Sequence, residues 1–253
     1  MLKQRIEDGV MIVTLENGKT NSLTRETLQK LQAVVKEVNG SESLKGIVLT
    51  GEGRFFSSGF DLPMFLSFKD PGDAADFIGY ADEVLLDLFT CDKPVVCAMN
   101  GHSAAGGLIL AMASDYRLVK NHPKIKLGMS EIKIGVPLSV AQGAVMRFGL
   151  DSDKRFRDVM YFGEMVDPET ARAMEMVDEV VEEADLIARA KEIVALWIDT
   201  PNRPFTLLKR KLKAGVVKEI REDLAEGSWK GAMDCFFKEE VRQVLAFVQS
   251  TME

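Results

Sequence analysis

Short apolar runs recur along the first half of the chain, each ended by glycine or another turn residue. VMIVTLE (10–16), GIVLTGEG (46–53) and PVVCAMNG (94–101) have this form. Apolar runs of this length, bounded by turn signals, are typical of strands covered on both faces of a sheet. We therefore predict three buried strands in this half.

Amphipathic segments separate these runs. Apolar residues at helical spacing follow Thr24, which is a suitable N-cap, and continue to Gly40, which is a suitable stop. The region from about 62 to 88 also has largely helical character. Strands that alternate with helices predict an α/β architecture with much parallel pairing.

The pattern changes after Pro137, where almost every segment has helical periodicity. Helices are predicted within VAQGAVMRFGL (140–150), DKRFRDVMYFG (153–163), PETARAMEMV (168–177) and ADLIARAKEIVALWID (184–199). Two further helices are expected at about 205–218 and 229–249.

Two prolines, Pro201 and Pro204, interrupt this helical pattern and mark the boundary that we predict. We expect an α/β core at residues 1–200 and a C-terminal helical region at residues 201–253. The sequence shows no repeat of constant period and no low-complexity linker.

Composition and charge narrow the class of protein. The 253 residues are 46% hydrophobic and 28% charged, which is ordinary for a globular chain with a sizeable core. The 39 acidic residues outnumber the 32 basic ones, and the densest basic run is KRKLKAG at 209–215. We interpret this run as one that caps a helix and meets solvent, and we expect no nucleic-acid partner.

Three widely spaced cysteines, Cys91, Cys97 and Cys235, indicate free thiols in a reducing compartment. The N-terminus alternates charged and apolar residues and does not have the plan of a leader peptide. The sequence contains no apolar stretch of the roughly 18 residues that would span a bilayer. We expect a cytoplasmic protein with no membrane partner.

Several familiar chemistries lack their motifs in this sequence. His102 and His122 have no cysteine or carboxylate neighbours at ligand spacing, so we expect no metal site. No G-x-S-x-G elbow of a serine hydrolase stands between a strand and a helix. The glycines of GEGRFFSSG (51–59) are spaced too widely for a dinucleotide fingerprint.

The segment FFSSGFDL (55–62) follows a predicted strand and carries three small residues, Ser57, Ser58 and Gly59. Small residues allow a ligand to approach the backbone closely. An ordinary tight turn would use the same residues. Both interpretations stay open for this segment taken alone.

The segment GHSAAGGLILAMASDY (101–116) also follows a predicted strand, and Gly106 and Gly107 open its helix. The first amide groups of a helix lack intrahelical acceptors and lie at the positive end of the dipole, so they can bind an anion or an oxyanion. Close packing of the helix would also require small residues here, and the two explanations are equally good.

Glu131 stands in the otherwise apolar and weakly basic stretch KLGMSEIKIGV (126–136). A carboxylate with few polar neighbours has a raised pKa, which makes it a good proton-transfer base near neutral pH. The alternative is an exposed glutamate on a loop before a helix, which is the usual place for this residue.

These three segments, in this order, resemble the enoyl-CoA hydratase/isomerase family, also called the crotonase superfamily. KTNSLTRETLQKL near the start, MVDPETARAMEMVDEVV in the middle and the last two predicted helices are similar to the same family. The resemblance implies an α/β spiral of ββα units with a C-terminal helical trimerisation region. It also implies an acyl-CoA thioester substrate, no separate cofactor, and a homotrimer or a dimer of trimers.

The resemblance assigns roles to particular residues. The backbone N–H groups of Phe60 and Gly106 match the two oxyanion-hole positions, and Glu131 matches a catalytic glutamate. The remaining positions that would bind substrate or CoA are Lys19, Ser22, Ser58, Asp61, Leu62, Gly107 and Ile109. The Phe60 ring replaces a small residue common in hydratases and would shape the acyl pocket.

Ile109 is the most informative difference from the hydratases of the family. They generally carry a second glutamate at this position, which holds water together with the first. A single base suffices to move a double bond, because it can take a proton from C2 of a 3-enoyl-CoA and return it to C4. The pattern is most similar to the Δ3,Δ2-enoyl-CoA isomerases, and we favour that activity.

Two alternatives to isomerisation stay open. Another crotonase reaction, such as hydration, decarboxylation or thioester hydrolysis, would need a carboxylate from the 62–88 region. The candidates are Asp70, Asp73, Asp76 and Asp82, although a solvated acidic face explains them more simply. A non-catalytic acyl-CoA-binding oligomer is the second alternative, and the retained Glu131 counts against it.

Overall fold

The computed structural model describes residues 1–252 and contains a six-stranded sheet with the strand order β1-β2-β3-β5-β7-β10. Its strands are β1 (Leu2–Glu7), β2 (Val10–Leu15), β3 (Gly46–Gly51), β5 (Val95–Met99), β7 (Tyr116–Lys120) and β10 (Glu179–Val181). Only β1 and β2 pair antiparallel, and the other neighbours in this sheet are parallel. The α/β architecture with parallel pairing is confirmed.

A smaller sheet with the order β4-β6-β8-β9 lies beside the first. Its strands are β4 (Phe55–Ser57), β6 (His102–Ala104), β8 (Leu127–Gly128) and β9 (Met165–Val166). The chain passes from β3 to β4, from β5 to β6 and from β7 to β8, and each time a helix follows the second strand. This repeated ββα unit has no counterpart as a sequence repeat.

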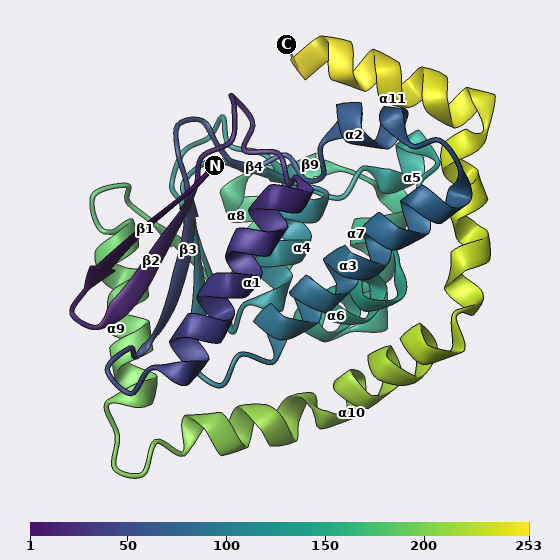
Figure 1. Ribbon diagram of the computed structural model, residues 1–253. Helices are drawn as coiled ribbons and strands as arrows, with labels where there is room; N and C mark the ends of the chain where they lie inside the picture. Colours follow the sequence, from purple (N-terminus) through teal and green to yellow (C-terminus); the bar gives the residue numbers. More distant parts are fainter. Residues whose placement is uncertain (253) are drawn as a thin grey trace.

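Helices cover both sheets (Figure 1). Those of the first half are α1 (Arg25–Gly40), α2 (Leu62–Ser67), α3 (Pro71–Phe89), α4 (Gly106–Ala113) and α5 (Glu131–Ile134). Those that follow are α6 (Val140–Leu150), α7 (Asp153–Phe162), α8 (Pro168–Ala173) and α9 (Leu186–Ile198). The chain ends with α10 (Phe205–Glu226), the 3-10 helix η1 (Ser228–Phe237) and α11 (Glu239–Met252).

The core lies on both faces of the larger sheet, because successive side chains of a strand point to opposite faces. On β2, Val10 and Ile12 pack in the cluster that contains α9, whereas Met11 and Val13 pack in the cluster that contains α1, α3 and α4. Figure 1 shows α9 on one side of the sheet and α1 on the other. Burial on both faces explains the continuous apolar runs of the sequence.

Local capping explains why several predicted boundaries agree with the structure. The Thr24 side chain accepts a hydrogen bond from Thr27 N at 3.3 Å and opens α1, which ends at Gly40. Ser139 and Gln142 form a capping box at the start of α6, the helix predicted at 140–150. Because caps are made by neighbours in sequence, they can be predicted without tertiary contacts.

Other elements differ from the prediction. Strand β1 was not predicted, since it lies at the edge of the sheet with mostly exposed residues and has no apolar run. Helix α10 continues past 218 to Glu226 and ends at Gly227, which has φ 74°. The single helix expected at 229–249 is replaced by η1 and α11, and buried Met233 and Phe236 recur at the three-residue repeat of a 3-10 helix.

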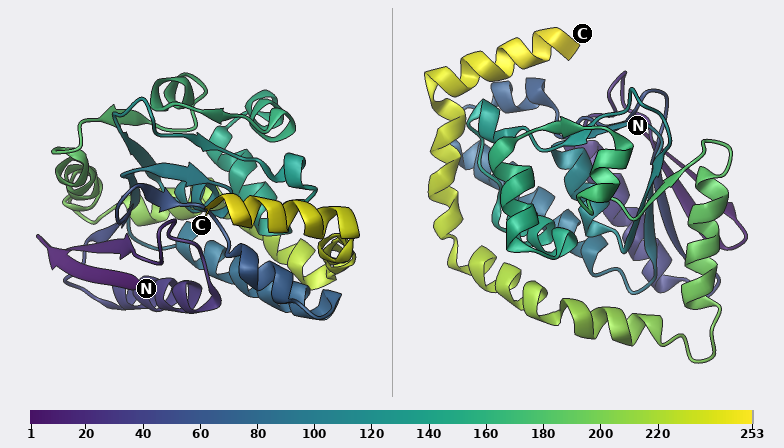
Figure 2. Two further views of the ribbon diagram at one scale, coloured as in Figure 1. Left: turned by 90° about the horizontal axis from the view of Figure 1, so that it is seen from above. Right: turned by 180° about the vertical axis from the view of Figure 1, so that it is seen from behind.

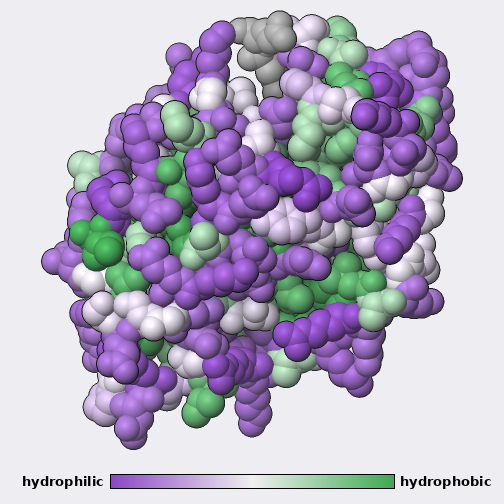
Figure 3. All heavy atoms as spheres, viewed as in Figure 1, coloured by the Kyte–Doolittle hydropathy of each residue, from purple (hydrophilic) through white to green (hydrophobic). Residues whose placement is uncertain are grey.

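The C-terminal region from α10 onward runs around the outside of the molecule, as the right view of Figure 2 shows. Its last helix, α11, packs on α2, and η1 packs on α3. No helix of residues 1–252 is long and apolar enough to cross a membrane. Figure 3 shows one face of the molecule as mostly hydrophilic, with hydrophobic residues in small separate patches.

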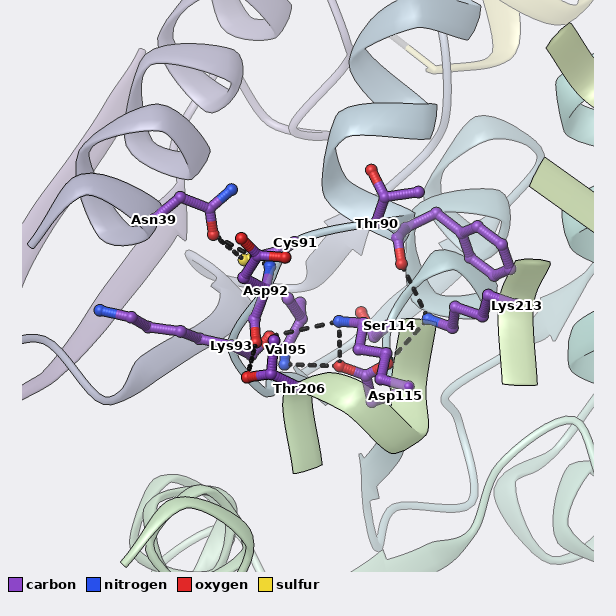
Figure 4. Close-up of polar contacts among 12 residues, drawn as sticks. Asn39, Thr90, Cys91, Asp92, Lys93, Val95, Ser114, Asp115, Thr206 and Lys213 are labelled. Carbon is purple, nitrogen blue, oxygen red and sulfur yellow. Dashed lines mark hydrogen bonds and ion pairs between the residues drawn. The ribbon is translucent and has the colours of Figure 1, made fainter. Parts of the chain in front are cut away.

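The basic run 209–215 does not simply meet solvent, and that interpretation is wrong for two of its lysines. Lys209 and Lys213 are buried, and their Nζ atoms lie 2.6 and 2.7 Å from the carboxylate of Asp115. Figure 4 shows Lys213 pointing toward Asp115 and toward the end of α3. Helical spacing places both lysines on the face of α10 that packs on the core. Burial lowers the pKa of Lys213 to about 8, although Asp115 opposes this shift.

Candidate active site

The three segments singled out in the sequence follow the ends of three neighbouring parallel strands. Phe60 lies just beyond β4, Gly106 just beyond β6, and Glu131 just beyond β8. Strands β4, β6 and β8 are adjacent and parallel, so the chain leaves all three at one edge of the small sheet. This topology brings the three residues together, although they are far apart in sequence.

The backbone amides of Phe60 and Gly106 lie close to each other. A Cβ atom placed on Gly106 would be 3.3 Å from Phe60 N, and one placed on Gly59 would be 2.7 Å from Gly106 N. The residues flanking Phe60 make the bridge to Leu23, through Gly59 O at 2.8 Å and Asp61 N at 3.2 Å. In that bridge Phe60 N faces away from Leu23. Gly106 N belongs to the first turn of α4, where the backbone N–H groups have no intrahelical acceptor.

The turn between β6 and α4 is held in a strained conformation. Ala105 has φ 52° and ψ -128°, a backbone conformation that residues other than glycine rarely adopt. Gly107 meets the strand β4, since a Cβ atom there would lie 2.3 Å from Ser57 O. Close packing therefore explains Gly107. A Cβ atom on Gly106 would also be in tight contact, 3.2 Å from Gly59 Cα, and a role for its amide stays a prediction.

Glu131 is only 8% exposed, so the alternative of a solvated loop glutamate does not hold. Its Oε2 atom is buried and accepts no hydrogen bond from the described residues. Burial raises the pKa of Glu131 to about 7, and backbone hydrogen bonds oppose this rise. The apolar surroundings read from the sequence have the expected effect on this carboxyl.

A cavity of about 60 Å³ lies between these groups. Gly106, Ile109 and Glu131 line it together with Phe60, whose ring packs on Phe65 and, edge-on, on Phe77. Further apolar walls come from η1, whose Met233 and Phe236 were not predicted as site residues. These two residues reach the cavity because the C-terminal region packs on the core, and no short sequence motif predicts that packing.

A larger groove of about 390 Å³ adjoins the cavity and shares Ser58, Phe60 and Leu62 with it. The predicted binding residues Lys19, Ser22 and Asp61 also line this groove, as do Val248 and Gln249 of α11, which sequence reasoning missed.

Two of the predicted binding residues have structural contacts of their own. The Asp61 carboxylate caps α2 through Met64 N and accepts a hydrogen bond from Ser22 Oγ at 2.9 Å. Gly107 is not among the described residues that line the groove or the cavity.

The four acidic candidates of the 62–88 region do not share one environment. Asp70, Asp73 and Asp76 are exposed, and Asp70 caps α3. Asp82 is fully buried, so its interpretation as part of a solvated face is wrong. It accepts a hydrogen bond from Ser139 Oγ at 2.5 Å, and burial raises its pKa to about 7. Ser139 lines the cavity, and Asp82 lies behind it.

Within residues 1–252, no cluster of three or more histidine, cysteine, aspartate or glutamate side chains could hold a metal ion. His102 and His122 instead border a separate pocket with Arg54, Lys120 and Lys124. Partial burial lowers the pKa of His102, and the positive charges of Arg54 and Lys126 lower it further.

Comparison with known proteins identifies relatives over most of the chain. The family model described as enoyl-CoA hydratase/isomerase matches residues 5–243. The mitochondrial enoyl-CoA delta isomerase 1 of Mus musculus is 29% identical over 215 residues, which are 84% of this chain and 73% of that protein. A probable enoyl-CoA hydratase of Bacillus subtilis is 26% identical and covers 77% of this chain and 74% of its own length.

Solved structures show the same fold. Human mitochondrial delta3-delta2-enoyl-CoA isomerase superposes with a TM-score of 0.91 over 99% of this chain and 97% of its own, at 21% identity. An enoyl-CoA hydratase from Mycobacterium marinum gives a TM-score of 0.79 over 90% and 99% of the two chains, at 23% identity. The family model matches nearly the whole chain, and the ββα units have the arrangement of the solved structures. This protein therefore belongs to the enoyl-CoA hydratase/isomerase family of enzymes and has its crotonase fold.

Proposed function

We propose that the protein is an enoyl-CoA isomerase that moves the double bond of a 3-enoyl-CoA to the 2-position. In this proposal the thioester oxygen accepts hydrogen bonds from Phe60 N and Gly106 N. The acyl chain enters the cavity beside Glu131, and the CoA portion lies along the groove lined by Lys19 and Ser22.

The proton transfers balance without any further reactant. The Glu131 carboxylate takes a proton from C2, and the electrons of that C–H bond form a dienolate whose negative charge rests on the thioester oxygen. The two amides stabilise this charge, since they are fixed in position before it develops. Glu131 then returns the proton to C4, which leaves a double bond between C2 and C3.

The observation that carries this proposal is the isolation of Glu131. It is the only carboxylate among the described residues that line the cavity, and its Oε2 has no partner there. Hydration would need a second group to hold and activate water. Ile109 occupies the place expected for it, and Asp82 reaches the cavity only through Ser139.

The test follows conjugation and hydration separately. Purified protein is offered a 3-enoyl-CoA and a 2-enoyl-CoA, and we expect isomerisation of the first without efficient hydration of the second. Glu131→Gln should lower kcat by about 10² to 10⁴, the usual contribution of general acid–base catalysis. The isomerisation rate of the wild type should rise through pH 7 as Glu131 loses its proton.

Two variants distinguish an isomerase from a hydratase. Asp82→Asn should keep conjugation activity, whereas a hydratase that relied on Asp82 would lose its activity. Ile109→Glu supplies the second carboxylate and should introduce measurable hydration. Efficient hydration by the wild-type protein, with no isomerisation, would refute the proposed function.

We also propose that the chain forms a homotrimer, alone or paired into a dimer of trimers, through α10. Leu207, Leu208 and Leu212 are 64–70% exposed on this helix, and a groove of about 770 Å³ beside it includes Trp197 and Phe205. Exposed apolar residues that gather on one helix favour an interface between subunits. A cytoplasmic location and the lack of a separate cofactor stay predictions.

A further inference from the structure

Gln142 lies at the wall of the cavity and is only 5% exposed. It is the third residue of α6, and its Oε1 accepts a hydrogen bond from Ser139 N at 3.3 Å. This bond fixes the orientation of the side-chain amide, since only the oxygen can face a backbone N–H. The Nε2 group is therefore placed on the other side, where it is buried and has no partner among the described residues.

The hydroxyl of Ser139, the neighbouring polar group, is not available as a hydrogen-bond donor to a ligand. Ser139 Oγ donates its proton to Asp82 at 2.5 Å and accepts a hydrogen bond from Gln142 N at 3.4 Å. Its hydroxyl is thus committed to the capping box and to Asp82. Among the described side chains that line the cavity, Gln142 is the one with an N–H group, and this group has no hydrogen-bond partner.

We propose that Gln142 Nε2 donates a hydrogen bond to a neutral oxygen on the acyl chain of the substrate, beyond the reacting carbons. The substrate class is then a short acyl-CoA that carries a carbonyl, hydroxyl or ether oxygen. This inference rests on the proposed function to the extent that the acyl group occupies the cavity. A buried donor without an acceptor is unfavourable, and an oxygen on the ligand would satisfy it.

Charge and size restrict the oxygen-bearing group. The described residues that line the cavity include no lysine or arginine, and both Glu131 and the buried Asp82 lie near it. A carboxylate on the acyl chain would be desolvated without a cation to pair with, so a neutral oxygen is favoured. The cavity of about 60 Å³ offers room for only a few atoms of the chain beyond the reacting carbons.

The test measures binding of saturated thioesters, which cannot isomerise. Heptanoyl-CoA is compared by calorimetry with its analogues in which the methylene at position 5 or 6 is replaced by an ether oxygen. We expect at least one oxygen analogue to bind the wild type on the order of threefold to tenfold more tightly than heptanoyl-CoA, the range of a single neutral hydrogen bond. In Gln142→Met, which keeps the length of the side chain, this preference should disappear.

The ratio of the affinities within each variant is the readout, so a change in stability from the lost capping box does not mimic the result. Gln249→Met is a matched control, because it removes a glutamine that lines the groove outside the cavity, and it should keep the preference. Equal or weaker binding of both oxygen analogues by the wild type would overturn the inference. So would a preference that survives in Gln142→Met.

The two proposals fail separately. A protein that isomerises 3-enoyl-CoA but shows no preference for oxygen contradicts only the role of Gln142. A protein that shows the preference without isomerising any 3-enoyl-CoA contradicts only the proposed reaction.

Discussion

The burial of Glu131 links chemistry to stability at the scale of a single residue. An apolar cavity favours the neutral acid, which raises its pKa to about 7 and brings the proton affinity near that needed for transfer at neutral pH. The same burial makes the ionised form unfavourable in the folded protein. The sequence predicts this behaviour because the neighbours of Glu131 in the chain are apolar.

The pH dependence of folding stability should reveal this cost. Because the folded pKa lies above the unfolded value of 4.5, the folded state binds the proton more tightly. The free energy of unfolding should therefore be highest below about pH 4.5 with respect to this group, fall as the pH rises to about 7, and stay level above that. The total fall from Glu131 is roughly 3–4 kcal/mol.

Urea unfolding of the wild type and Glu131→Gln at pH 5 and pH 8 measures this effect. The variant should gain stability relative to the wild type at pH 8, because its amide carries no charge. Burial also raises the pKa of Asp82 to about 7, so its ionisation lowers the free energy of unfolding over the same pH range. Part of the pH dependence of stability should therefore remain in Glu131→Gln and diminish further when Asp82→Asn is added. An identical slope in wild type and Glu131→Gln contradicts the assignment.

Gln142 shows the limit of sequence reasoning at this scale. It stands three residues after Ser139, which is the spacing of the capping box that the structure contains. The burial of its Nε2 beside a cavity depends on where α5, α6 and η1 meet. No pattern within the helix itself carries that information.

At the scale of elements, the site depends on how α4 begins against β4. Figure 1 places α4 inside the molecule, and all its residues are buried. Gly107 allows the helix to approach Ser57, and the strained Ala105 precedes Gly106, whose backbone lies close to Phe60 N. The helical periods of α1, α6 and α7 were readable from sequence. The short strands β8, β9 and β10 were not, since they pair through partners far away in the chain.

Gly107→Ala should destabilise the protein by about 1–3 kcal/mol, the usual cost of forcing extra atoms into a packed site. The added Cβ would lie 2.3 Å from Ser57 O, a backbone atom that cannot rotate away. Thermal unfolding measures the loss, and kcat should fall because the two amides are pushed apart.

Gly143→Ala in α6 is the matched control for this prediction. A Cβ atom there has no heavy atom within 4 Å apart from its chain neighbours and the backbone of its own helix, so the variant should gain up to about 1 kcal/mol from helix propensity. Similar changes in stability for the two variants would show that Gly107 is not a packing position.

At the scale of the whole molecule, buried charges hold α10 against the core. Lys209 and Lys213 share Asp115, and Asp115 also accepts a hydrogen bond from Val95 N at the start of β5. Asp115 in turn follows α4, so this network joins the C-terminal region to the unit that carries Gly106. The predicted boundary near residue 200 falls in the turn between α9 and α10.

Asp115→Asn should destabilise the protein by about 3–5 kcal/mol, because two buried lysines would lose their only carboxylate partner among the described residues. Urea unfolding monitored by the fluorescence of Trp197 and Trp229 reports the loss, and Trp197 borders the groove that Asp115 also lines. Asp92→Asn, which breaks the exposed pair with Arg210, is the control and should cost less than about 1 kcal/mol. Equal costs for the two variants would contradict the role of the buried network.

The outer face of α10 provides the last prediction, on assembly. Its inward lysines fix the helix on the core, and this arrangement turns Leu208 and Leu212 outward, where they are 64% and 69% exposed. Light scattering on the purified wild type should give about three or six times the chain mass of 28.1 kDa. Leu208→Glu combined with Leu212→Glu should reduce the mass to that of one chain, since two charges would be buried without partners in the interface. Ile6→Glu, a charge placed on the exposed edge strand β1, should leave the mass unchanged. A wild-type protein that runs as a single chain would show that these leucines serve another purpose.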